Sequence, residues 1–139
     1  MIMTTKILLA THGKFADGIY DSLKLIVGDV ENVDRICMYV DEDIDYSSKI
    51  TEYLSNHDYD KFRLLVITDL FGGSINNEFM SYMDKYDFYL VAGLNLCLLL
   101  EFTLQNGELT KNKIQEVIER AYKGIVLCND LVASEDESF

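Results

Sequence analysis

Proline and tryptophan are absent from the 139 residues, and basic residues are few: 12 Lys and Arg stand against 24 Asp and Glu. The formal net charge of −12 argues against nucleic-acid binding, because an acidic surface repels the phosphate backbone. The same charge favours a protein partner with a basic patch, or it serves only to keep the protein soluble. Composition alone does not choose between these two interpretations.

Cysteine is also scarce, with three residues that lie far apart in apolar runs: Cys37, Cys97 and Cys128. No CxxC motif and no Cys–His pairing is present, so nothing in the sequence indicates a zinc site. Free cysteine in apolar surroundings behaves as a small hydrophobic residue. We therefore expect three core thiols in a reducing compartment.

Long hydrophobic runs are missing as well. The longest apolar stretch, residues 88–100, contains Asn95 and is too short to span a bilayer. Residues 1–13 lack the apolar segment and the cleavage site of a signal peptide. We expect a cytoplasmic protein with a single domain over residues 1–130, followed by an acidic, flexible tail over residues 131–139.

Short apolar runs alternate with amphipathic segments along the chain, which is typical of an α/β protein. Strands that are apolar throughout indicate a sheet covered on both faces, hence a doubly wound, mostly parallel sheet with helices on both sides. Strands are expected at 6–11, 33–40, 62–68 and 87–92, with a last short strand at 124–128. Helices are expected at 15–27, 46–55, 74–84, 96–104 and 111–122.

Chemically useful residues follow the first and third expected strands. His12 and Gly13 end the first strand, and Asp69 begins the DLFGGS stretch after the third. In the common strand order 2-1-3-4, strands one and three are neighbours, and ligands bind where the order reverses. We therefore expect His12, Asp69 and the segment 72–74 to meet in one crevice.

His12 is one of two histidines, and an isolated histidine is more often a surface or core residue than a catalytic one. The position of His12 at the end of a strand, followed by Gly13, favours a catalytic role. A neutral imidazole offers a nucleophilic nitrogen, and a phosphorylated ring nitrogen remains a good leaving group. Asp69 could accept the hydrogen of the other ring nitrogen, or it could be an ordinary loop or capping carboxylate. His57 is expected to be an exposed loop residue.

The segment Gly72-Gly73-Ser74 leads directly into an expected helix, with Ser74 as a plausible N-cap. Small residues allow amide groups to approach an anion, and the positive end of a helix dipole favours one. The helix that follows Gly13 points at the same crevice. A Gly-Gly-Ser turn is usually only a turn, but beside a histidine it indicates a phosphate cradle formed by Gly13, Gly72, Gly73 and Ser74.

Competing binding sites fit less well. Residues 41–45 partly mimic a calcium loop, but Tyr46 occupies the position that requires glycine. A receiver domain phosphorylated on aspartate would need an acidic pair where Thr11 and His12 stand. No Walker lysine motif or GxGxxG fingerprint indicates nucleotide binding. We expect neither a metal nor a cofactor.

Three stretches, ILLATHGKFADGI, TDLFGGSINN and VAGLNLCLLLE, resemble the mannose/fructose/sorbose-type IIA component of the bacterial phosphoenolpyruvate-dependent sugar phosphotransferase system (PTS). The resemblance extends over nearly the whole chain. Two departures are Ile75 and Cys97, which stand where that family usually has proline. Losing proline in the first turn of a helix removes a preset backbone angle but no functional group.

The resemblance implies a phosphotransferase that works through a phosphohistidine. His12 would accept phosphate on Nε2 from the phosphocarrier protein HPr and pass it to a IIB component, and through it to the membrane IIC and IID components. Asp69 would orient the ring, and Ser74 would be the family's serine. The resemblance also implies a homodimer in which residues 124–128 form an antiparallel strand on the partner's sheet. A regulatory module that senses phosphorylation or binds an anion or a partner is the alternative.

Overall fold

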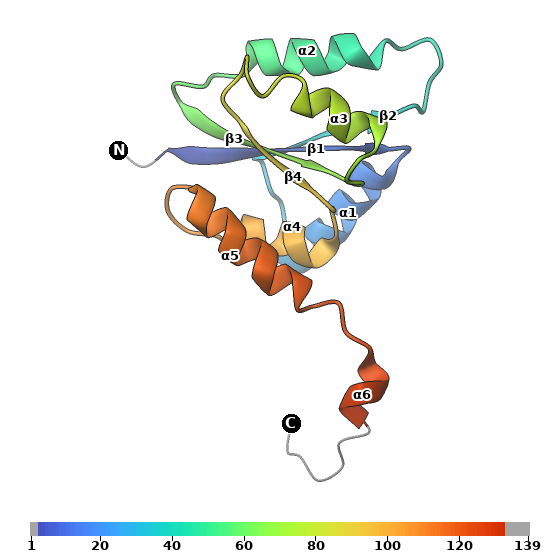
Figure 1. Ribbon diagram of the computed structural model, residues 1–139, viewed down its shortest axis with the longest axis vertical. Coiled ribbons are helices and arrows are strands. Elements are labelled where there is room, and N and C mark those ends of the chain that lie inside the picture. Colours follow the sequence, from blue (N-terminus) through green and yellow to red (C-terminus); the bar gives the residue numbers. More distant parts are fainter. Residues whose placement is uncertain (1–2, 133–139) are drawn as a thin grey trace.

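The computed structural model describes residues 3–132 and confirms the predicted α/β fold. Four parallel strands form one sheet in the order β2-β1-β3-β4, with α2 and α3 on one face and α1, α4 and α5 on the other (Figure 1). The strands are β1 (Thr4–His12), β2 (Val33–Met38), β3 (Phe62–Thr68) and β4 (Tyr89–Ala92). The helices are α1 (Phe15–Val27), α2 (Tyr46–Asn56), α3 (Ser74–Met80), α4 (Leu96–Thr103), α5 (Lys111–Tyr122) and α6 (Cys128–Val132).

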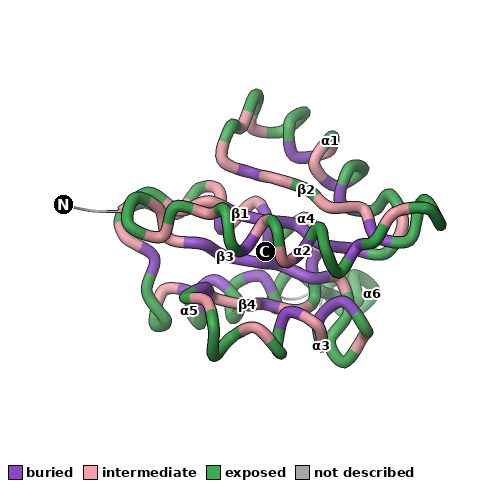
Figure 2. The backbone as a smooth tube through the Cα atoms, turned by 90° about the horizontal axis from the view of Figure 1, so that it is seen from above, coloured by how far each residue is buried: buried purple, intermediate pink, exposed green. Residues whose placement is uncertain are grey.

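The two central strands are apolar over residues 7–10 and 64–67, where both of their faces are covered. Successive side chains point to opposite faces, so Ile7 and Leu9 pack in the core beneath α1, α4 and α5. Leu8 and Ala10 pack in a second core beneath α2 and α3. Figure 2, which looks onto the sheet from the α2 side, shows buried stretches along the strands and alternating buried and exposed stretches along the helices.

Strand register brings the predicted site residues to one edge of the sheet. Ala10 of β1 pairs with Thr68 of β3, and His12 pairs with Met38 of β2. His12 and Asp69 therefore both lie just beyond the β1–β3 pairing, where the strand order reverses. This is the edge at which ligands bind in doubly wound folds.

Two elements end earlier than the sequence pattern predicts. Strand β2 ends at Met38 because Tyr39 has a φ of 64°, in the left-handed region, which interrupts an extended strand. Helix α3 ends at Met80 and not near residue 84, since the next amides, from Ser81 to Met83, bond to carbonyls three residues back and form turns.

The strand predicted at 124–128 is not formed in the described part of the chain. After α5, residues 124–127 run away from the body, and Cys128 begins the short helix α6 (Figure 1). Ile125, Val126 and Leu127 are exposed there. A strand needs a pairing partner, and this segment does not reach the sheet of its own chain. Residues 133–139 of the predicted tail lie outside the described residues.

The prediction of three core thiols is wrong for two of them. Cys97 lies in the first turn of α4 and is exposed, and Cys128 is exposed on α6, away from the body of the fold. Cys37 is half-buried on β2, and burial raises the pKa of its thiol. Within residues 3–132, no helix combines the length and the apolar character needed to cross a membrane.

Candidate functional site

His12 and Asp69 are in direct contact. The ring Nδ1 of His12 lies 3.0 and 3.2 Å from the two carboxylate oxygens of Asp69, and the backbone amide of His12 donates to Asp69 Oδ2 at 2.9 Å. A carboxylate only accepts, so this geometry fits the tautomer in which Nδ1 carries the hydrogen and Nε2 keeps a free lone pair. The His12 side chain is 43% exposed, whereas Asp69 is only 13% exposed. The free nitrogen is therefore on a ring that a docking protein can reach.

Three polar side chains next to the strand ends are buried and hydrogen-bonded: Thr11, Thr68 and Asn76. Thr11 Oγ1 accepts the amide hydrogen of Ala16 at 2.8 Å and so fixes the start of α1. Thr68 Oγ1 donates to Asn76 Oδ1 at 2.8 Å and ties the end of β3 to α3. Because buried polar groups are costly when unpaired, these bonds hold both loops in place.

The loop between Asp69 and α3 passes close to the imidazole. The amide of Gly73 donates to Leu70 O at 3.1 Å, and the side-chain amide of Asn77 donates to Gly72 O at 3.2 Å. A Cβ atom on Gly73 would lie 3.6 Å from His12 Cε1. The Gly-Gly turn thus forms one wall of the site.

The four predicted phosphate-binding residues differ in what their amides do. The amide of Gly13 donates to Met38 O at 2.8 Å, and that of Gly73 donates to Leu70 O, so both take part in turns. The amides of Gly72 and Ser74 donate no backbone hydrogen bond within the described residues. The prediction of Ser74 as N-cap is wrong: Gly73 has the extended backbone of the cap, and Ser74 is the first helical residue. Phosphate contact by any of the four stays a prediction.

Tyr39 is a site residue that the sequence analysis missed. Its hydroxyl lies 3.1 Å from Ser74 Oγ, and its ring centroid lies 5.6 Å from that of the His12 imidazole. The available signal was its position, directly after the strand that neighbours β1. A strand prediction extended through residue 40 hid this signal, because it treated Tyr39 as part of the sheet.

Exposed apolar side chains occupy the loops that carry the site. Phe15 follows the His12 loop, Val40 follows Tyr39, and Leu70 and Phe71 follow Asp69; Phe71 is 79% exposed. Apolar groups gathered around a reactive group are typical of a surface that another protein covers. No three His, Cys, Asp or Glu side chains within residues 3–132 lie close enough together to hold a metal ion.

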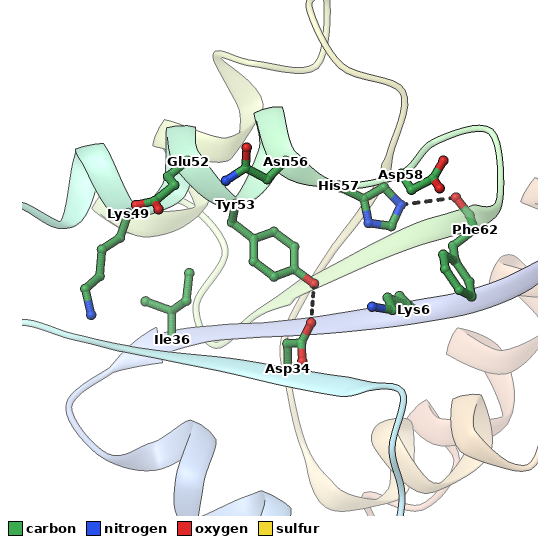
Figure 3. A pocket seen from close by; sticks show the side chains of 10 residues that line it. All are labelled: Lys6, Asp34, Ile36, Lys49, Glu52, Tyr53, Asn56, His57, Asp58 and Phe62. Carbon is green, nitrogen blue, oxygen red and sulfur yellow. Dashed lines mark hydrogen bonds between the residues drawn. The ribbon is translucent and has the colours of Figure 1, made fainter.

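Apart from the site around His12, a cleft of about 490 Å³ opens between α2 and the β2 edge of the sheet (Figure 3). Tyr53 donates to Asp34 Oδ2 at 2.7 Å, and burial, together with this carboxylate, raises the pKa of Tyr53 above its ordinary value. His57 directly follows α2, in the loop as predicted, but it is half-buried and not exposed, and its Nε2 lies 3.1 Å from Phe62 O. These groups are bonded within the protein, which gives them a structural role.

Comparison with known proteins gives one family. The profile of the family described as PTS system fructose IIA component matches residues 6–132. A search of curated proteins gave no significant match.

Several solved structures share the fold. A Klebsiella pneumoniae protein, proposed to be a phosphoenolpyruvate-dependent sugar PTS permease, is 32% identical, with a TM-score of 0.83 over 94% of this chain and 95% of that one. The PTS component EIIA from Streptococcus agalactiae is 29% identical, with a TM-score of 0.76 over 91% and 99% of the two chains. The mannose/sorbose-specific IIA subunit from Enterococcus faecalis, 24% identical, covers 90% and 95% with a TM-score of 0.78 and shows the same fold.

Proposed function

The chain belongs to the family of PTS fructose IIA components, and from this premise we propose that it carries a phosphoryl group on His12 between two proteins of a sugar phosphotransferase system. The donor is HPr and the acceptor is a IIB component, which serves the membrane IIC and IID components. The observation that supports this proposal best is the contact between His12 Nδ1 and Asp69, which leaves Nε2 as the free nucleophile on an exposed ring.

Transfer follows directly from that tautomer. The lone pair of His12 Nε2 attacks the phosphorus of the donor's phosphohistidine, and the donor's N–P bond breaks with its electron pair returning to the donor ring. Nδ1 keeps its hydrogen throughout, so no proton has to leave. The ring gains positive character as the new N–P bond forms, and the Asp69 carboxylate stabilises that charge. Onward transfer to the IIB component reverses these steps.

The phosphoryl oxygens need hydrogen-bond donors on the loop before α3. The amides of Gly72 and Ser74 and the Ser74 hydroxyl are the donors that we assign first, since the two amides donate no backbone hydrogen bond within the described residues. Gly13 and Gly73 contribute by bringing the backbone close to the anion. Their amides would reach phosphate only by giving up the bonds to Met38 O and Leu70 O.

Docking of the two partner proteins uses the surface around His12. The exposed apolar side chains on the three loops, Phe71 above all, suit the centre of a transient protein interface. The net charge of −12 suits partners with basic patches and speeds their encounter. We place this exchange in the cytoplasm, with contact to the membrane only through the transporter complex.

A homodimer is part of the proposal. Strand β4 pairs only with β3 among the described strands, so its other edge is open, beside a groove of about 530 Å³ between α3 and α5. Apolar side chains on all sides of this groove, such as Phe88, Val91 and Ile114, suit an apolar segment. The exposed segment Ile125–Leu127 of a second copy would supply it as an antiparallel strand.

Phosphorylation by purified enzyme I, HPr and labelled phosphoenolpyruvate tests the function. We expect acid-labile, base-stable label on the native chain and on His57→Ala, which retains His12, and none on His12→Ala. Label that persists on His12→Ala would exclude the mechanism. Discharge by a IIB component separates transport from the regulatory alternative: if phospho-His12 forms and no IIB component accepts the phosphoryl group, the chain is a sensor.

A further inference from the structure

Tyr39 lies beside His12 in a backbone conformation that tyrosine rarely adopts. Its φ of 64° is the only positive φ among the non-glycine residues 3–132. A bulky residue in this region is strained and persists only where the surrounding structure holds it. Strained residues concentrate at functional sites, so the conformation calls for a role.

The surrounding structure does hold the loop that carries Tyr39. The hydroxyl oxygen of Tyr46 accepts the amide hydrogens of Val40 and Asp41, at 3.1 and 3.0 Å. The Tyr39 and Tyr46 rings meet edge to face, with centroids 5.8 Å apart. On the other side, Met38 O accepts the amide hydrogen of Gly13 at 2.8 Å. The position of Tyr39 is therefore built into the fold.

This placement brings the Tyr39 hydroxyl to Ser74, at the start of α3, and the Tyr39 ring to 5.6 Å from the His12 imidazole. The hydroxyl lies 3.1 Å from Ser74 Oγ, and Ser74 directly follows Gly73, where a Cβ atom would lie 3.6 Å from His12 Cε1. Cε1 is bonded to both ring nitrogens; Asp69 binds Nδ1, which leaves Nε2 as the nitrogen that would carry the phosphoryl group. The hydroxyls of Tyr39, after β2, and of Ser74, the first residue of α3, thus share one hydrogen bond beside the imidazole.

We infer that Tyr39 is a further phosphate-contacting residue, whose hydroxyl donates to a phosphoryl oxygen on His12 together with that of Ser74. This inference rests on the proposed function. Each hydroxyl has one hydrogen, and in the free protein one of them is used in the Tyr39–Ser74 bond. On phosphorylation both hydrogens turn to the anion, where charge-assisted bonds are stronger. Tyr39 forms no covalent bond, and the only bond exchanged is the N–P bond described above.

The position of the transfer equilibrium with HPr measures this contact. Tyr39→Phe keeps the ring and removes the hydroxyl, so the equilibrium constant for forming the phosphorylated chain should fall by roughly three- to tenfold. Ser74→Ala should have a similar effect. The double variant should fall by more than the product of the two single effects. The first substitution also removes the Tyr39–Ser74 bond that phosphorylation would have to break, which offsets part of its loss, whereas the second substitution has no such offset. Tyr59→Phe is the matched control, since its hydroxyl donates to Leu54 O outside the site.

A second measurement separates contact from support of the fold. Phosphorus NMR over a pH titration reports the pKa of the second ionisation of the phosphoryl group. Hydrogen-bond donors stabilise the dianion and so lower this pKa. Tyr39→Phe should raise that pKa and Tyr59→Phe should leave it unchanged. If the native chain is phosphorylated on His12 and Tyr39→Phe matches it in both measurements, the inference is wrong while the function stands. If the native chain takes no phosphate on His12, the proposed function fails and this inference with it.

Discussion

Asp69 binds His12 at two places, the ring nitrogen Nδ1 and the main-chain amide, at 3.0 and 2.9 Å. One carboxylate therefore orients the imidazole and also joins the end of β1 to the loop after β3. The bond to the main chain does not depend on the state of the ring. The strand ends should therefore keep their separation while the ring gains and loses a phosphoryl group.

Asp69→Asn tests the contribution of the carboxylate to ring orientation. The asparagine amide keeps the shape of the carboxylate but replaces one oxygen with an NH₂ group. That group would face one of the two His12 donors, the Nδ1–H or the main-chain N–H, so the preference for hydrogen on Nδ1 should weaken. We expect the transfer rate to fall by on the order of a hundredfold, because small misplacements of reacting groups reduce rates by that much. Nitrogen-15 NMR of the imidazole should show a larger fraction of the Nε2–H tautomer.

Asp17→Asn is the matched control for that experiment. It makes the same change of charge at an aspartate whose carboxylate lies 3.1 Å from Arg35 Nε, and it does not contact His12. Its transfer rate and tautomer ratio should equal those of the native chain. Equal losses in the two variants would mean that net charge, and not the contact with the ring, sets the rate.

The neighbouring asparagines at the start of α3 should differ in what they contribute to stability. Asn76→Ala leaves the buried Thr68 hydroxyl without its acceptor, which should lower the free energy of unfolding by about 1–3 kcal/mol. Asn77→Ala removes an exposed bond to Gly72 O and should cost less than about 0.5 kcal/mol. Urea denaturation at neutral pH measures both, and equal losses would contradict the assignment of Thr68 and Asn76 as a supporting pair.

Stability should fall in alkaline solution. Burial, with weaker effects of Tyr86 and Asp87, raises the pKa of Tyr59 to about 12 from its ordinary value of 10.0. The folded state then resists ionisation more than the unfolded state, so the contribution of Tyr59 is complete below pH 10 and declines as pH rises towards 12. Urea midpoints between pH 8 and 11 should show this decline, and Tyr59→Phe should reduce it. A decline of equal size in that variant would assign the effect to other groups.

Association through the C-terminal segment is tested by placing a charge on it. Ile125→Asp should shift the native chain from dimer to monomer, because the carboxylate would have to enter an apolar groove. Leu25→Asp is the control, since Leu25 is equally apolar and 89% exposed on α1. Light scattering after gel filtration measures the mass. A native chain that is monomeric, or a dimer that survives Ile125→Asp, would contradict the exchange of this segment.

Much of the fold follows from patterns that are local in the sequence. The bounds of α1, β3 and α5 agree with the predicted 15–27, 62–68 and 111–122. Each segment has a clear apolar repeat and ends at glycine or polar residues. The strand order 2-1-3-4, taken as the common order of doubly wound sheets, agrees with the structure and brings His12 and Asp69 to one edge. Their roles in transfer stay predictions.

The parts that were missed depend on contacts distant in sequence. The Tyr46 hydroxyl holds the loop in which Tyr39 adopts its left-handed conformation, and a tyrosine at position 39 does not by itself indicate that conformation. The apolar run at 124–128 forms no strand within its own chain because no sheet edge is within reach, and its pairing with a partner's sheet stays a prediction. The exposure of Cys97 depends on which side of α4 faces outward, and that of Cys128 on the position of α6 away from the body; short apolar runs reveal neither.

The adjacent glycines of the loop before α3 are required for different reasons. Gly72 has a φ of 79° and open space around it, so asparagine, which tolerates this torsion, is the replacement it would accept best. Gly73 has ordinary torsions, but a methyl group there would lie 3.2 Å from Leu70 O and 3.6 Å from the imidazole. Torsion restricts one position and crowding the other. In a library randomised at these two codons, the residues that retain transfer activity should therefore differ between positions 72 and 73. Larger residues at position 73 should narrow the space through which an incoming phosphoryl group reaches the imidazole.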